Sequence, residues 1–259
     1  MKIAILGAGA FGTALGGILA EKGYDIDYYD SKCMNETLTE VLAKAKMLVL
    51  AVPSKAVPYL LPRLPKDKPM IIATKGILSD KIFADFKDYM IISGPGFADD
   101  IKAGKKTILT ATDKRIVDMF GTDYLTFDFT DDEKGVLMCG ALKNVYALFC
   151  GLLGLKAGTE EHSKFLRETA REMAQVLEAN GAKAETVNLV CGKGDLKLTC
   201  DYPSRNYEFG QILRKNKKAV PEKTVEGLSA LSKIKNGAIA VPEDAIKLKD
   251  LITRSNEWA

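Results

Sequence analysis

Three glycines near the start of the chain constrain the fold of its first part more than any other feature. They lie in the segment GAGAFG at residues 7–12, after a short apolar run, Lys2–Leu6, and at the start of a helical stretch, Phe11–Lys22. Glycines at this spacing between strand and helix permit a tight turn, a close approach of backbone to a pyrophosphate, and close packing of helix on strand. The segment predicts a dinucleotide site; a glycine-rich turn without ligand is the alternative.

A carboxylate at the end of the second expected strand bears on the choice of dinucleotide. Asp30 follows the run Asp25–Tyr29. A carboxylate in this place accepts hydrogen bonds from the adenosine ribose hydroxyls and repels a 2′-phosphate. Asp30 therefore favours NAD over NADP, although Lys32 could soften that preference. A solvated aspartate at a strand end is the other interpretation.

The first half of the chain alternates short apolar or β-branched runs with helical stretches. Such alternation predicts βαβ units, a parallel sheet and helices on both of its faces, which is a doubly wound Rossmann-type α/β fold. The expected strands are Lys2–Leu6, Asp25–Tyr29, Met47–Ala51, Met70–Thr74, Met90–Ser93, Thr107–Thr112 and Leu125–Phe129. The expected helices between them are Phe11–Lys22, Thr37–Lys44, Lys55–Leu64, Asp80–Tyr89 and Asp113–Phe120.

Strand patterns stop after about residue 130, and the remainder is expected to be helical. Thr130 is a candidate N-cap for a nearly all-apolar and therefore buried helix, Val136–Leu155. Further helices are expected at Lys164–Ala179 and Tyr207–Lys215. The chain is accordingly divided into a dinucleotide-binding domain, 1–132, and a smaller all-helical substrate and catalytic domain, 133–259.

Composition excludes several classes of protein. The net charge of +3 is too small to indicate a nucleic-acid partner, and 47% apolar with 27% charged residues is typical of a globular protein. The apolar stretch Ile3–Ala20 is broken by glycines, so it is interpreted as core rather than as a signal peptide or membrane insertion. Five cysteines without a C-x-x-C pair indicate reduced thiols and a cytoplasmic protein; they are Cys33, Cys139, Cys150, Cys191 and Cys200.

The single histidine narrows the chemistry further. One His excludes multi-histidine metal sites, and no metal is expected. His162 lies in a charged stretch that resembles a solvated helix start, and it is given no catalytic role. Proton transfer is therefore expected to come from Lys, Asp, Glu or Tyr.

One lysine stands inside the expected buried helix. Lys143 and its neighbour Asn144 need a partner or a cavity there, because an unsatisfied polar group in a core costs several kcal/mol. A buried lysine can have a lowered pKa that suits proton transfer near neutral pH. The alternative is a lysine whose ammonium reaches water along its apolar stem.

Three further segments carry groups that suit an anionic ligand. Ser204 is a candidate N-cap that would place Arg205 and Asn206 at a helix start, where arginine suits phosphate or carboxylate; ordinary capping with a solvated arginine is the alternative. The loops 74–76, with Lys75, and 93–98 each follow an expected strand, the position where ligands bind in open α/β sheets.

These motifs, taken in order, resemble the bacterial NAD(P)-dependent glycerol-3-phosphate dehydrogenase family. The resemblance runs from residue 1 to about 230. It rests on GAGAFGTALG at 7–16, AVPS at 51–54, TKGI at 74–77, SGPGFA at 93–98, GALKNVYAL at 140–148, GDLKLTC at 194–200, SRNYEFG at 204–210 and VEG at 225–227.

The resemblance implies an oxidoreductase that interconverts dihydroxyacetone phosphate and sn-glycerol 3-phosphate for phospholipid synthesis, with NAD or NADP, as a homodimer. It implies that Lys143 is the acid–base group, and that Lys75, Asp195 and Thr199 complete the catalytic set. Substrate contacts are implied for Lys75, Lys143, Gly94, Gly96, Asn144, Asp195, Ser204, Arg205 and Asn206. Cofactor contacts are implied for Gly7, Gly9, Ala10, Phe11, Gly12, Asp30, Pro53, Lys75, Ala98, Arg205 and Glu226.

The chain also departs from the family pattern. The segment before Thr37 and the region after about Gly237 are short, and Gly96 stands where a serine or threonine is usual. Thr159-Glu160 replaces the family's Asp-Asn, and Lys193 replaces a small residue. Two other functions therefore stay open: a related Rossmann dehydrogenase of another small hydroxy acid, and a catalytically idle NAD(H)-binding paralogue.

Overall fold

The computed structural model describes residues 1–31, 37–201 and 204–258. Lys32 and Cys33 lie outside these ranges. The contacts within the chain define two compact units, of which the first comprises Met1–Thr74 and Asp80–Glu133. The second comprises Lys75–Ser79 and Lys134–Ala259.

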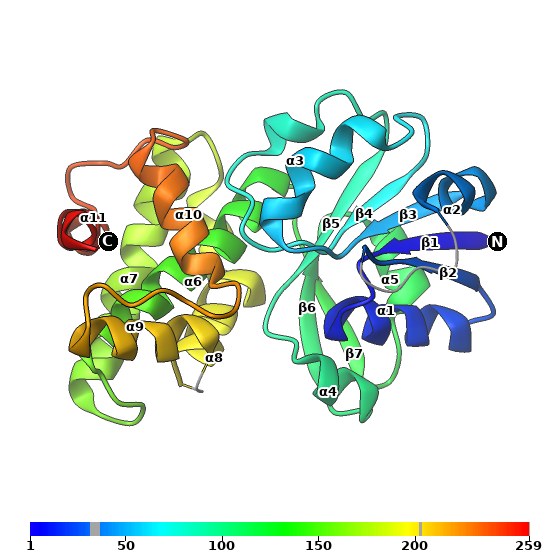
Figure 1. Ribbon diagram of the computed structural model, residues 1–259. Helices are drawn as coiled ribbons and strands as arrows, with labels where there is room; N and C mark the ends of the chain where they lie inside the picture. The colour runs from blue at the N-terminus through cyan, green and yellow to red at the C-terminus, as the bar shows by residue number, and fades with distance from the viewer. Residues whose placement is uncertain (32–36, 202–203, 259) are drawn as a thin grey trace. The chain divides into compact units, whose positions relative to one another are not determined.

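The first unit is built on a seven-stranded sheet in the order β2-β1-β3-β4-β5-β6-β7 (Figure 1). Every predicted strand is present, with ends that differ by no more than two residues. The strands are β1 (Lys2–Leu6), β2 (Asp25–Tyr29), β3 (Met47–Leu50), β4 (Met70–Ile72), β5 (Tyr89–Ser93), β6 (Thr107–Ala111) and β7 (Leu125–Phe129).

The sheet is parallel, as predicted, except at one pair of strands. Strands β1 to β5 are parallel, but β6 runs antiparallel to β5 and parallel to β7. The helix between β5 and β6 is α4 (Ala98–Lys102), which has only five residues and which the sequence did not predict. At 1.5 Å per residue it spans about 7.5 Å, too little to return the chain along β5.

Helices lie on both faces of this sheet, and Figure 1 shows α1 (Ala10–Glu21) and α3 (Val57–Leu60) on opposite sides of it. The predicted helix Lys55–Leu64 is observed as three short helices, η1, α3 and η2. Pro58 lies in the first turn of α3 and Pro62 in the first turn of η2, where proline is tolerated. The helices are α1 (Ala10–Glu21), α2 (Leu38–Lys44), η1 (Ser54–Ala56), α3 (Val57–Leu60), η2 (Leu61–Arg63), η3 (Asp80–Phe83) and α5 (Lys114–Phe120).

The predicted helix Asp80–Tyr89 is wrong beyond its first turn. Only η3 is helical, and Tyr89 already belongs to β5. The backbone N–H of Lys87 donates to the carbonyl of Lys66 at 3.0 Å instead of continuing a helical ladder. Phe83 and Phe86 are both buried, with ring centroids 6.3 Å apart. Tertiary packing therefore overrides the local helical tendency.

The second unit is helical in all its described elements. They are α6 (Glu133–Leu153), α7 (Glu160–Ala179), η4 (Ala184–Asn188), η5 (Val190–Gly194), α8 (Asp195–Asp201), α9 (Arg205–Lys215), α10 (Glu226–Lys235), α11 (Ile246–Arg254) and η6 (Ser255–Glu257).

Helix α6 forms the centre of this unit. Its residues are buried without interruption from Gly135 to Gly151. Within the described chain it is the one helix long and apolar enough to cross a membrane, yet 89% of its most apolar window is covered by the protein. Thr130 is not its N-cap, because α6 begins at Glu133 and the Thr130 hydroxyl accepts from the N–H of Asp132 at 3.1 Å, in the turn before the helix.

A buried carboxylate on α7 joins three helices of the second unit. Glu172 is 6% exposed, and its Oε2 accepts from the hydroxyl of Tyr146 on α6 at 3.1 Å. The same carboxylate accepts from the backbone N–H groups of Lys247 at 2.9 Å and Leu248 at 3.2 Å. These two donors lie at the start of α11, where the helix dipole favours negative charge. Glu172 therefore fixes α11 to α6 and α7.

We predict that Glu172→Ala lowers the free energy of unfolding by at least about 3 kcal/mol, because it leaves three donors, two of them buried, without an acceptor. Glu172→Gln keeps one oxygen acceptor and loses less. Glu168→Gln is the matched control: it lies one turn away, and its carboxylate pairs with the side-chain Nζ of the same Lys247 at 2.7 Å in a more exposed position. Urea denaturation of the three variants measures the difference; equal losses for Glu172→Ala and Glu168→Gln would contradict the role of Glu172.

Candidate active site

The glycine turn in the first unit has the geometry of a pyrophosphate cradle. Gly7 has a φ of 111°, and a Cβ there would lie 2.6 Å from the carbonyl oxygen of Ala51. A Cβ on Gly12 would lie 2.0 Å from the carbonyl oxygen of Gly7, so the helix could not pack so closely. A Cβ on Gly9 would meet nothing within 4 Å. Two glycines thus shape the turn, while the third leaves open space above the N-terminus of α1.

Residues at the carboxyl ends of the parallel strands surround this turn. The N–H of Gly7 donates to the carbonyl of Tyr29 at 2.8 Å, which places the following Asp30 beside the turn. The N–H of Ala51 donates to the carbonyl of Leu6 at 2.8 Å, and Pro53 follows two residues later. Ala10 and Phe11 form the first turn of α1. This arrangement fits a dinucleotide, with phosphates at the helix N-terminus and Asp30 toward a ribose.

The loop after β5 lies at the same edge of the sheet. Gly94 has a φ of 140°, and its carbonyl accepts from the N–H of Gly96 at 2.9 Å. Ala98 is the first residue of α4. A Cβ on Gly96 would lie 3.0 Å from Leu109 Cδ2, so a larger side chain needs that leucine to move. The structure therefore gathers the predicted cofactor residues of the first unit with Gly94 and Gly96 at one edge.

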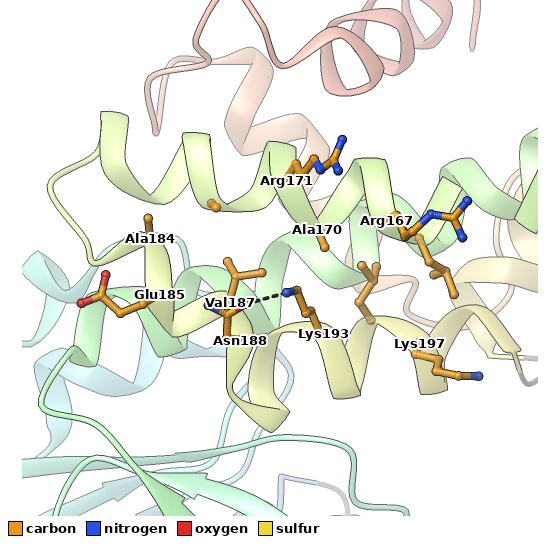
Figure 2. A pocket seen from close by; sticks show the side chains of 12 residues that line it. Arg167, Ala170, Arg171, Ala184, Glu185, Val187, Asn188, Lys193 and Lys197 are labelled. Atoms are coloured by element: carbon orange, nitrogen blue, oxygen red, sulfur yellow. Dashed lines mark hydrogen bonds between the residues drawn. The ribbon is translucent and has the colours of Figure 1, made fainter. Parts of the chain in front are cut away.

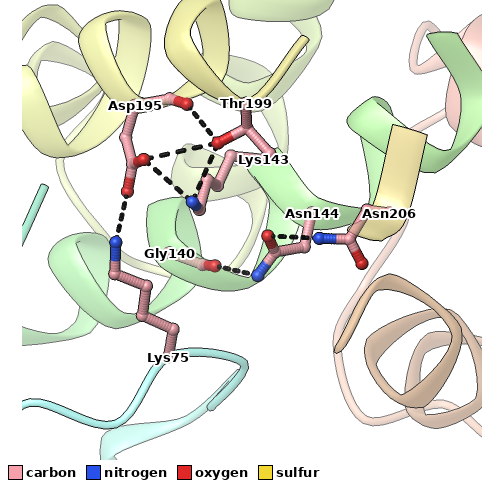
Figure 3. A network of polar contacts seen from close by, with 7 residues as sticks. All are labelled: Lys75, Gly140, Lys143, Asn144, Asp195, Thr199 and Asn206. Carbon is pink, nitrogen blue, oxygen red and sulfur yellow. Dashed lines mark hydrogen bonds and ion pairs between the residues drawn. The ribbon is translucent and has the colours of Figure 1, made fainter. Parts of the chain in front are cut away.

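A network of two lysines and one carboxylate occupies the second unit (Figure 3). Lys143 on α6 donates from Nζ to Asp195 Oδ1 at 2.8 Å and to Thr199 Oγ1 at 2.9 Å. Lys75 donates from Nζ to Asp195 Oδ2 at 3.0 Å. The Thr199 hydroxyl donates to the backbone carbonyl of Asp195 at 2.6 Å, which orients it as an acceptor for Lys143. All four predicted catalytic residues thus meet in one network.

Burial tunes the charges in this network. Lys143 is 6% exposed and Asp195 is 1% exposed. Burial lowers the pKa of Lys143 to about 8; Asp195 opposes that shift, and the positive charge of Lys75 adds to it. Burial alone would raise the pKa of Asp195, but the ammonium groups of Lys143 and Lys75 outweigh it and keep the pKa below its usual value. A lysine whose pKa is about 8 can both donate and accept a proton close to neutral pH.

The geometry also contradicts the alternative interpretation of Lys143, in which its ammonium reaches water. The ammonium of Lys143 does not reach water along its stem, because it is held inside by Asp195 and Thr199. Among the described residues it donates to those two oxygens, and an ammonium has three N–H donors. One donor of Lys143 is therefore left for a further acceptor.

Two asparagines form a second network, also shown in Figure 3. Asn206 Nδ2 donates to Asn144 Oδ1 at 2.8 Å, and Asn144 Nδ2 donates to the carbonyl of Gly140 at 3.0 Å. Asn206 Oδ1 accepts from the N–H of Gly227 at 2.8 Å. A Cβ on Gly227 would lie 2.4 Å from the carbonyl oxygen of Asn144, so glycine is required there. Gly227 belongs to the VEG segment of the resemblance, but the sequence analysis assigned it no role, because that role depends on a neighbour distant in the chain.

The asparagine network holds the start of α10 against α6. Glu226, a predicted cofactor residue, is the first residue of α10 and directly precedes Gly227. Asn144 and Asn206, predicted as substrate contacts, therefore also position the backbone that carries Glu226.

The start of α9 has the predicted form. The Ser204 hydroxyl accepts from the N–H of Tyr207 at 3.2 Å, which confirms it as the N-cap. Arg205 is exposed, and its guanidinium contacts the backbone carbonyl of Thr224 at 3.4 Å. An exposed guanidinium at a helix start is available to an anion.

The expectation of a solvated His162 is wrong. Helix α7 begins at Glu160, earlier than predicted, with Thr159 as its N-cap, and His162 in its first turn is 2% exposed. Its Nε2 lies 3.6 Å from Asp201 Oδ1 on α8. His162 therefore packs between α7 and α8. It takes part in none of the contacts of Lys143 described above.

Known proteins resemble this chain over most of its length. The family model for the C-terminus of NAD-dependent glycerol-3-phosphate dehydrogenase matches residues 132–243. A glycerol-3-phosphate dehydrogenase [NAD(P)+] of Rhizobium etli is 30% identical, over 89% of this chain and 86% of the relative. The corresponding protein of Leptospira biflexa is 31% identical, over 92% of this chain and 85% of the relative.

Solved structures agree on the fold. The glycerol-3-phosphate dehydrogenase of Coxiella burnetii aligns with a TM-score of 0.79 at 24% identity, over 97% of this chain and 94% of that chain. A ketopantoate reductase of Staphylococcus aureus aligns less well, with a TM-score of 0.52 at 14% identity, over 99% of this chain and all of that chain. Given the identity and coverage of the sequence relatives, the chain belongs to the NAD(P)-dependent glycerol-3-phosphate dehydrogenase family.

Proposed function

We propose that the protein interconverts dihydroxyacetone phosphate and sn-glycerol 3-phosphate with a nicotinamide dinucleotide, and so supplies phospholipid synthesis. The observation that carries this proposal is the buried Lys143, with a pKa lowered to about 8 and one N–H donor unused among the described residues. Such a group can hydrogen-bond a substrate carbonyl and give it a proton.

The chemistry divides between cofactor and protein. When bound, the dinucleotide supplies or accepts the hydride at C2 of the substrate. In the direction of reduction, Lys143 gives its proton to the carbonyl oxygen at C2, which becomes the hydroxyl of sn-glycerol 3-phosphate. In the reverse direction neutral Lys143 takes that proton. Asp195 and Thr199 hold the Nζ of Lys143 in place for both directions.

The remaining residues bind the two ligands. Arg205 and Ser204 at the start of α9 suit the phosphate of the substrate, because arginine and a helix N-terminus both favour anions. Lys75 keeps a side chain that is 24% exposed, from which it can contact substrate and cofactor while it neutralises Asp195. Asp30 favours NAD, so NADH is expected to serve better than NADPH.

A homodimer in the cytoplasm completes the proposal. The four described cysteines, Cys139, Cys150, Cys191 and Cys200, are all free thiols, which supports a reducing compartment. Dimerisation rests on the resemblance to the family.

The reaction itself is tested by consumption of NADH and of NADPH with dihydroxyacetone phosphate, with ketopantoate as the comparison substrate. We predict that Lys143→Met lowers turnover of dihydroxyacetone phosphate at least about 100-fold, since it removes the proton donor. The dissociation constant for NADH should stay unchanged.

The control for Lys143→Met is Lys164→Met, the same substitution at an exposed position on α7, which should keep full activity. Near wild-type turnover by Lys143→Met would rule out the assignment of the proton donor. A wild-type protein that reduces ketopantoate but not dihydroxyacetone phosphate would overturn the substrate.

The pH dependence provides a second test. Because reduction needs protonated Lys143, kcat/KM for dihydroxyacetone phosphate should fall as pH rises through about 8, and kcat/KM for sn-glycerol 3-phosphate should rise there. Lys75→Gln removes a positive charge that lowers the pKa of Lys143, so both inflections should move to higher pH. Lys215→Gln, the same change at an exposed position on α9, should leave them in place. Unmoved inflections in Lys75→Gln would contradict the coupling of the two lysines.

The cofactor site is tested by two glycine substitutions of equal size. Gly9 has a φ of −72°, which alanine adopts freely, and open space around it. We predict that Gly9→Ala keeps the melting temperature but weakens NADH binding at least about tenfold, about 1.4 kcal/mol, because the new methyl group occupies the phosphate position. Gly12→Ala should lower the melting temperature, because its Cβ would clash with Gly7. Unchanged NADH binding in Gly9→Ala, measured by calorimetry, would place the dinucleotide elsewhere.

A further inference from the structure

The second unit contains a groove of about 800 Å³ whose lining includes no member of the lysine network (Figure 2). It lies between α7 on one side and η4, η5 and α8 on the other. Its volume is within the range of small-molecule sites, roughly 300–1,000 Å³.

The middle of the groove is apolar. Leu166, Ala170 and Ala174 recur every fourth residue on α7 and so share one face of that helix. Val187 and Leu196 contribute apolar side chains from the opposite wall. The two alanines are small, so a slot between the helices is left for an apolar chain.

Positive charge is concentrated at one end of the groove. Figure 2 shows Arg167 and Lys197 flanking that end from opposite walls, while the ammonium of Lys193 points toward Asn188 in the middle of the groove. Ala184 and Glu185, the one acidic residue of the lining, lie at the other end. The guanidinium of Arg171 points away from the groove in this view.

Arg167 and Lys197 at this end, with Lys193 next along the groove, can accept an anion. Lys193 Nζ donates to the neutral Asn188 Oδ1 at 2.5 Å, and no carboxylate in the described ranges forms an ion pair with it. Arg167 pairs with Glu160 at 2.9 Å, and Lys197 pairs with Asp201. Both cations are well exposed, and ion pairs at the surface are weak, so a ligand anion can replace these partners at small cost.

We propose that the groove binds an amphipathic anion, an alkyl or acyl chain that ends in a phosphate or carboxylate. The head lies between Arg167 and Lys197, on the side of the groove from which Lys193 adds positive charge, and the chain runs along Ala170 and Ala174. The site is separate from the proposed reaction, although Leu196 and Lys197 lie on the same helix as Asp195 and Thr199.

The test is calorimetry on the full chain with three probes: n-octyl phosphate, inorganic phosphate, and n-octyl glucoside, which has the same chain and a neutral head. Octyl phosphate should bind one molecule per chain, at least about tenfold more tightly than either other probe, because it alone presents both parts. Ala174→Phe fills the slot and should abolish this binding. The pair Arg167→Gln and Lys197→Gln should weaken it at least about tenfold.

The matched control for the charge change is the pair Lys164→Gln and Lys215→Gln, which lies outside the groove and should bind as wild type. If Ala174→Phe does not fold, the Arg167 and Lys197 variant decides alone. Equal binding of octyl phosphate and octyl glucoside, or of octyl phosphate and inorganic phosphate, would overturn the proposal.

Binding that persists in both groove variants would also overturn the proposal, because it would lie elsewhere on the chain. So would a dimer that dissociates in Ala174→Phe while octyl phosphate binding is unchanged, since the groove would then be a subunit interface. All these readouts are binding or mass, so a failed reaction and a failed groove are distinguishable.

Discussion

The second unit is organised around one buried carboxylate that pairs with two ammonium groups. Asp195 is 1% exposed, and each of its oxygens accepts from a different lysine, Lys143 or Lys75. A buried charge is costly unless it is paired and its lone pairs are satisfied. The two lysines satisfy that requirement together. Their combined charge exceeds that of the carboxylate by one, and this surplus helps Lys143 to lose its proton near neutral pH.

Three distant parts of the chain must meet for this arrangement to exist. Lys143 comes from the middle of α6, Asp195 and Thr199 come from α8, and Lys75 comes from the short segment Lys75–Ser79. The asparagine pair and Glu172 make comparable connections, to α10 and α11. Polar groups in this unit thus join helices whose apolar faces alone would not fix one orientation, which is a recognised use of buried hydrogen-bond networks.

Local patterns predicted the parts of the site that depend on neighbours in sequence. The glycine turn, the strand ends and the Ser204 cap each follow from residues a few positions apart. Lys143 was identifiable because a lysine inside an apolar helix violates the pattern around it. Family resemblance, rather than spacing, singled out Asp195 and Thr199 as its partners.

The errors arose where distant contacts decide the structure. Nothing near Glu172 in the sequence indicates that it caps α11, and the requirement for glycine at 227 comes from the carbonyl of Asn144. His162 is buried because α8 packs against its side of α7. The reversed direction of β6 depends on the length of α4, which the sequence analysis did not resolve.

The chain passes from one unit to the other more than once. The polypeptide enters the second unit for five residues, Lys75–Ser79, returns to the first, and enters again at Lys134. Neither unit is therefore a continuous stretch of sequence. A gene fragment for residues 134–259 would encode Asp195 without one of its two ammonium partners. Recombination at the boundary before Lys134 would separate Lys75 from Asp195, so an exchanged helical unit keeps both ammonium partners only if the new nucleotide-binding domain supplies a lysine in the place of Lys75.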